Sequence, residues 1–83
     1  MLNVLYFASL REAFGKANEP MALPVPPDVS GLIAALRARG GTWSEALGAD
    51  KRWRVAVNQE MAAMNTPLKP GDEVAIFPPV TGG

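Results

Sequence analysis

The sequence predicts an α+β domain in which a mixed sheet of four to five strands packs on one main helix. Three observations favour this fold class. Short runs of strand-forming residues lie near both ends of the chain, at 2–8 and 73–77. One apolar stripe with helical spacing follows Asp28. Turn signals separate the remaining short segments, and 83 residues suffice for only one small domain.

The N-terminal segments are interpreted from their strand formers and turn residues. Residues 2–8 predict a strand with apolar side chains on both faces. Residues 9–14 favour a helical turn, which ends at a Gly15-Lys16 turn signal. Apolar residues alternate over 20–25, and the prolines that interrupt them are typical of an edge strand.

The main helix is expected to begin after Asp28, whose side chain suits an N-cap. Gly40 and Gly41 are expected to end it. Gly31, in its first turns, costs about 1 kcal/mol relative to alanine. Residues 42–47 open with capping-box spacing and predict one further short helical turn. The stripe at i, i+3, i+4 and i+7 consists of Val29, Leu32, Ile33 and Leu36.

Three further strands are predicted at 53–58, 61–64 and 73–77. Between the last two, Leu68 is a candidate core residue and 69–72 is a strong turn. A hairpin, a helix and then further strands is the order of the β-grasp fold, the fold of ubiquitin, in which helix and sheet share a two-layer core. In the first of these strands the inward residues are Val55 and Val57.

Composition excludes several function classes. Eight basic and eight acidic residues give a net charge of zero, which argues against a nucleic-acid or anionic-membrane binder. The chain has no histidine and no cysteine, so the usual zinc sets and histidine-assisted nucleophiles are not expected, nor is any metal site. Absence of cysteine also fits the cytoplasm. No basic signal-peptide region or long apolar run is present.

The strands also predict an apolar patch on the sheet face that the helix leaves free. One helix covers one face, and the other face should be polar if it meets only water. Apolar side chains on that face often mark a partner site. The alternative is that a loop such as 42–52 folds over them. The predicted patch comprises Leu5, Phe7, Ala75 and Phe77, with Met61 at its margin.

The last seven residues are typical of a presented tail. Pro78 and Pro79 lack backbone N–H groups, so they should stop sheet pairing and keep the chain extended. The segment divides the chain into a domain at 1–77 and a tail at 78–83. Gly82 and Gly83 carry no Cβ and leave the terminal carboxylate unshielded, able to enter a narrow slot. Val80 and Thr81, both short and β-branched, precede them.

The stretch from Leu68, Leu-Lys-Pro-Gly-Asp-Glu-Val-Ala-Ile-Phe-Pro-Pro-Val-Thr-Gly-Gly, resembles the C-terminus of the small subunit of molybdopterin synthase, a ubiquitin-like sulfur carrier. The opening at 4–8, with Arg11-Glu12, and the segment 56–59 resemble that family as well. Over 15–53 the match is in pattern only. The resemblance therefore extends over nearly the whole chain.

The resemblance implies a sequence of reactions at the tail. A ubiquitin-activating-like enzyme would use ATP and magnesium to adenylate the carboxylate of Gly83, so that the chain carries nucleotide as a covalent adenylate. Sulfur would replace AMP to give a thiocarboxylate. The tail, positioned by Pro78, Pro79, Val80, Thr81 and Gly82, would enter the large synthase subunit of a heterotetramer. There it would donate sulfur to a cyclic pyranopterin, and two donations would build the dithiolene of molybdopterin, the precursor of the molybdenum cofactor.

On this interpretation the chain is not an enzyme on its own and binds no cofactor permanently. The patch, with Leu5, Phe7, Met61, Ala75 and Phe77, would be the docking surface. Arg11 would join it, although a plain solvated arginine explains that residue equally well. Three alternatives remain: the sulfur carrier of thiamin thiazole synthesis, a protein modifier that forms isopeptide bonds, and an interaction domain with an inert tail.

Overall fold

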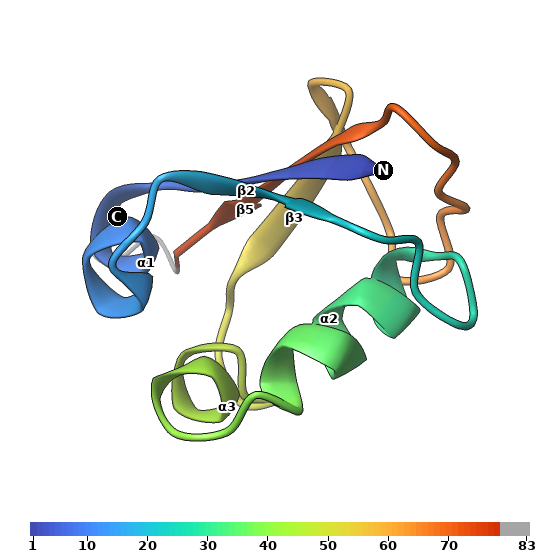
Figure 1. Cartoon of the computed structure of the whole chain (residues 1–83). Helices are drawn as coiled ribbons and strands as arrows, with labels where there is room; N and C mark the ends of the chain where they lie inside the picture. The colour runs from blue at the N-terminus through green and yellow to red at the C-terminus, as the bar shows by residue number, and fades with distance from the viewer. Residues whose placement is uncertain (79–83) are drawn as a thin grey trace.

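In the computed structural model, which describes residues 1–78, five strands form one mixed sheet accompanied by three helices (Figure 1). The strand order is β2-β1-β5-β3-β4, with β1 and β5 parallel and the other neighbours antiparallel. This is the predicted α+β arrangement. The elements are β1 (Leu2–Tyr6), α1 (Ala8–Phe14), β2 (Asn18–Met21), α2 (Val29–Arg37), α3 (Thr42–Ala46), β3 (Arg54–Val57), β4 (Glu60–Met61) and β5 (Glu73–Phe77).

The core lies between the sheet and α2 (Figure 1). The predicted helical stripe is confirmed, because each of its four residues is buried. From the sheet, Val4, Val55, Val74 and Ile76 meet this stripe. The predicted core residue Leu68 is also buried, so the segment before β5 is fastened to the same core. Within residues 1–78, no helix combines the length and apolar character needed to cross a membrane.

Asp28 caps α2 as predicted. Its Oδ1 accepts hydrogen bonds from the Ser30 hydroxyl at 2.7 Å and from the Gly31 N–H at 2.8 Å, and these bonds lower the pKa of the carboxyl. Gly31 is required for a reason that sequence did not reveal. A Cβ at this position would lie 2.0 Å from the carbonyl oxygen of Pro26, so the close approach of the preceding loop excludes any side chain.

The first four strands have boundaries that differ from those predicted. The first strand stops at Tyr6 rather than residue 8, because the chain turns into α1 there. The second occupies 18–21 rather than 20–25; Met21 lies opposite Leu2, so no partner residue of β1 remains beyond it. It is an edge strand, as predicted. The third occupies 54–57 rather than 53–58.

The fourth strand is the two residues of β4 rather than 61–64. Asn58 and Gln59 both have positive φ, so they form a two-residue hairpin turn that places Glu60 opposite Val57. After Met61 the Ala62 N–H still donates to the Val55 carbonyl at 2.9 Å. The chain then turns toward α2, where the Met64 carbonyl accepts from the Ser30 N–H at 2.8 Å.

α2 is the main helix, as predicted. The short helices α1 and α3 lie where helical turns were predicted, at 9–14 and 42–47. α2 ends at Arg37, before the expected Gly40-Gly41 cap. Gly40 has a φ of +76°, and its N–H donates to the Arg37 carbonyl. At α3, Gly41 is the N-cap and the expected capping box is absent, because Thr42 is already inside the helix.

Candidate functional site

The sheet face opposite α2 carries a continuous apolar row. Strand register places Leu5 of β1 beside Ala75 of β5, Ala75 beside Ala56 of β3, and Ala56 beside Met61 of β4. Alternation along β5 sends Val74 and Ile76 into the core and turns Ala75 outward. The four strands therefore bring the side chains that sequence assigned to one patch onto one face.

Phe7 and Phe77 extend this row at the end of β5. Their rings stack with centroids 4.8 Å apart and an interplanar angle of 12°. The Phe7 N–H donates to the Ile76 carbonyl at 3.2 Å, which continues the β1–β5 ladder one residue past β1. Phe7 remains 41% exposed and Met61 63% exposed. We call the surface formed by Leu5, Phe7, Ala56, Met61, Ala75 and Phe77 the outer-face patch.

The alternative that residues 42–52 cover the patch is wrong. Trp43 of α3 packs on the opposite side of the sheet, where its ring stacks on Phe14 at 3.8 Å and meets the edge of Tyr6 at 5.5 Å. Leu47 is buried in the core. In Figure 1, α3 lies on the same side of the sheet as α2. Segment 42–52 thus completes the core and leaves the outer face free.

Arg11 lies on α1, one helical turn after Phe7, and its side chain is exposed. Among residues 1–78, no ion pair or side-chain hydrogen bond joins it to the patch. The structure thus brings five of the six predicted docking residues together and leaves Arg11 beside them.

Two residues of this face were missed from sequence. Ala56 fills the gap between Ala75 and Met61, and Arg54 lies directly opposite Phe77. The signal was available: if Val55 and Val57 face inward, their neighbours along the strand face outward. The prediction applied alternation to 2–8 and 73–77 and did not extend it to 53–58.

The start of β5 is tied to the β3–β4 turn by hydrogen bonds of Asp72 and Asn58. Asp72 is buried, and its carboxylate accepts from the Asn58 side chain at 3.0 Å, the Lys69 N–H at 3.0 Å and the Lys69 ammonium at 3.2 Å. The hydrogen bond from Asn58 is the main reason that the pKa of Asp72 is lowered. The Asn58 side chain also accepts from the Glu73 N–H, so the turn at 69–72 is joined to the β3–β4 hairpin.

Phe77 is the last residue of β5, and Pro78 follows it, half-buried and outside the strand. A proline here is consistent with the end of pairing, because it has no N–H to donate. The other predicted tail residues lie outside the described residues; they are Pro79, Val80, Thr81, Gly82 and Gly83.

Comparison with known proteins agrees with this geometry. Residues 4–83 match the model of the ThiS family. The chain is 42% identical, over 100% of both sequences, to the molybdopterin synthase sulfur carrier subunit of Escherichia coli. Among solved structures, a putative molybdopterin converting factor subunit 1 from Pyrococcus furiosus superposes with a TM-score of 0.80 at 31% identity, covering 95% of this chain and 97% of that one.

A second solved structure includes a partner. It is the complex of subunits 1 and 2 of the molybdopterin-converting factor from Helicobacter pylori, which matches with a TM-score of 0.66 at 30% identity over 99% of this chain and 97% of that one. The family model and the full-length relative agree with the β-grasp sheet and with the resemblance found in the sequence. The chain belongs to the ThiS family and is a relative of its molybdopterin synthase sulfur carrier subunits.

Proposed function

We propose that this chain is the sulfur carrier subunit of a molybdopterin synthase and acts together with a large catalytic subunit. The observation that carries the proposal is the 42% identity to the Escherichia coli subunit over the full length of both chains. The Helicobacter pylori complex supports a large-subunit partner. A sulfur carrier of the thiamin pathway would share the fold and the tail. The full-length relative from Escherichia coli is a molybdopterin synthase subunit, which favours the molybdopterin pathway.

The proposed chemistry is confined to the C-terminal carboxylate of Gly83. A carboxylate is a poor acyl donor because its leaving group would be oxide. ATP converts it to an acyl adenylate with release of pyrophosphate, and a sulfur nucleophile then displaces AMP to leave a thiocarboxylate. ATP and magnesium belong to the adenylating enzyme in this scheme, and this chain supplies only the acyl group.

In the synthase, the thiocarboxylate sulfur attacks a side-chain carbon of the cyclic pyranopterin. The carbon–sulfur bond forms as a carbon–oxygen bond of that carbon breaks, and the oxygen leaves as water or as a phosphate oxygen. Water then cleaves the acyl–sulfur bond, which regenerates the carboxylate and leaves sulfur on the pterin. Two charged carriers are needed for the two sulfurs of a dithiolene. Two copies of this chain with two large subunits, in the cytoplasm, would suit that stoichiometry.

The arrangement of the domain supports this scheme. The outer-face patch lies beside Phe77, where the chain leaves the sheet, so a partner docked on the patch stands next to the root of the tail. Ala56 and Ala75 are buried at the centre of the patch, and the exposed apolar side chains around them, Phe7 and Met61, are typical of a protein interface. Pro78, Pro79, Val80, Thr81 and Gly82 would then act as the spacer that positions Gly83.

The test is direct. The chain is incubated with its adenylating enzyme, ATP, magnesium and a sulfur source, and intact-protein mass spectrometry follows the C-terminus. We expect the mass to rise by the difference between sulfur and oxygen, and the charged chain to convert pyranopterin to molybdopterin when the large subunit is added. A variant without Gly83 should do neither. A charged chain that leaves the pterin unchanged would refute the synthase assignment.

A further inference from the structure

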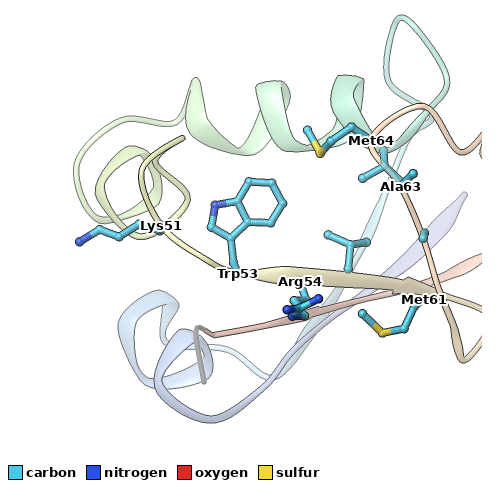
Figure 2. Close-up of a pocket in the computed structure, with 9 residues that line it drawn as sticks. Lys51, Trp53, Arg54, Met61, Ala63 and Met64 are labelled. Atoms are coloured by element: carbon cyan, nitrogen blue, oxygen red, sulfur yellow. The ribbon is translucent and has the colours of Figure 1, made fainter. Parts of the chain in front are cut away.

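Three cations occupy one short segment beside the outer-face patch. Lys51, Arg52 and Arg54 flank Trp53 at the start of β3, and all three are exposed. Arg54 lies across from Phe77 in the β3–β5 register. Figure 2 shows Arg54 and Met61 on the side of β3 that faces away from α2, while Trp53 points toward α2. A positive charge therefore stands beside the root of the tail.

A groove opens next to these cations because β4 is so short. β4 pairs with Ala56 and Val57, and the Ala62 N–H still donates to the Val55 carbonyl at 2.9 Å, so the strand edge without a neighbour begins before Val55. The groove lies between that edge and α2 and has a volume of about 290 Å³. Its apolar lining includes Val29, Trp53, Val55 and Met64 (Figure 2).

The charged residues that line the groove are both basic. Lys51 and Arg54 line it, and no carboxylate belongs to the part of its lining that the structure describes. None of the three cations forms an ion pair within residues 1–78. Exposed carboxylates lie next to the lining in sequence, Asp50 before Lys51 and Glu60 before Met61, while Glu73 begins β5, four residues or roughly 13 Å from Phe77.

The size of the groove indicates what it can hold. Clefts that bury small ligands usually measure roughly 300–1,000 Å³ and are more enclosed. A groove at the lower limit of that range, open along a strand edge, instead suits one apolar side chain of a protein. The net charge of zero argues against a nucleic-acid partner.

We infer that this groove and its basic rim bind a segment of the large synthase subunit that offers one apolar side chain flanked by carboxylates. The inference rests on the proposed function. Arg54 and Met61 connect the groove to the outer-face patch, so the two form one surface that wraps around the edge of β3. The patch supplies apolar contact at the tail, and the rim supplies orientation and speeds encounter by charge attraction.

The experiment measures binding of purified large subunit to immobilised full-length chain at low and high salt. Arg54→Glu and Lys51→Glu should each lower the association rate about tenfold at low salt and flatten its salt dependence. Met64→Gln, which keeps the charge, should raise the dissociation rate. The matched control is Arg37→Glu at the C-terminal end of α2, an exposed cation eight residues or roughly 12 Å along the helix from the groove residue Val29, which should bind like the unmodified chain.

Melting curves of each variant confirm that the fold is retained. If Phe77→Asp abolishes binding while the three groove variants match the control, the partner uses only the patch and this inference is overturned, although the proposed function stands. If the unmodified chain does not bind the large subunit at all, both the proposed function and this inference fail.

Discussion

Glu19 is the most connected ionic group of the described chain, and its removal should be costly. The Tyr6 hydroxyl donates to its Oε2 at 2.6 Å, and two nitrogens of Arg39 donate to its two oxygens at 2.9 and 3.0 Å. Lys16 is 3.8 Å away. The guanidinium of Arg39 also lies 4.4 Å from the centre of the Trp43 ring. One carboxylate thus joins the edge strand β2 to β1 and to the segment after α2.

Glu19→Ala should destabilise the fold mainly through Tyr6. That side chain is only 2% exposed, so its hydroxyl would lose its acceptor inside the protein, at a cost of about 1–3 kcal/mol. Loss of the ion pair adds at most about 1 kcal/mol, because the Arg39 side chain is 32% exposed and screened by water. A total of about 1–4 kcal/mol corresponds to a fall in melting temperature of roughly 4–32 °C.

Thermal unfolding followed by circular dichroism measures this effect. Glu12→Ala, an exposed change on α1, is the control and should be nearly neutral. Tyr6→Phe combined with Glu19→Ala should cost less than the sum of the single changes, because no hydroxyl is then left unpaired. A melting temperature of Glu19→Ala equal to that of the control would refute the reasoning.

The same carboxylate predicts a pH dependence. Hydrogen bonding from Arg39 is the main reason that the pKa of Glu19 lies below its ordinary value of 4.5. A lowered folded-state pKa gives stability that is fully present above the unfolded pKa and is lost as pH falls through the folded pKa. The stability gap between the unmodified chain and Glu19→Gln should therefore be widest near neutrality and narrow below about pH 4.5.

Four further predictions test other parts of the structure. Gly31→Ala should lower the free energy of unfolding by about 1–3 kcal/mol in urea titration, since its Cβ would meet the Pro26 carbonyl; no change would show that the loop yields freely. Asp28→Ala should cost about 1 kcal/mol by the same assay through loss of the N-cap. Phe77→Asp should weaken large-subunit affinity in calorimetry, and equal affinity would remove the patch as the interface. Deletion of Gly83 should abolish sulfur charging but leave the melting temperature unchanged, because the core is built from residues before Pro78.

The fold was largely predictable because local signals agreed with the tertiary structure. The helical stripe from Val29 to Leu36 is buried as its spacing requires, and β5 has the predicted bounds. The patch was predicted from alternation, since a strand sends successive side chains to opposite faces, and from the β-grasp order, in which the strands at 2–8 and 73–77 are neighbours. The helix stripe depends on backbone periodicity only, whereas the patch also depends on which strands pair.

By itself, the sequence determined the fold class, the main helix, the core stripe, the patch residues and the relationship to sulfur carriers. Only the tertiary structure decided where the second and fourth strands end, why position 31 must be glycine, and that Arg54 stands beside Phe77. The reason is that these facts depend on contacts between segments far apart in the chain. A strand ends where its partner does, and a glycine or an arginine acquires its role from whatever folding places next to it.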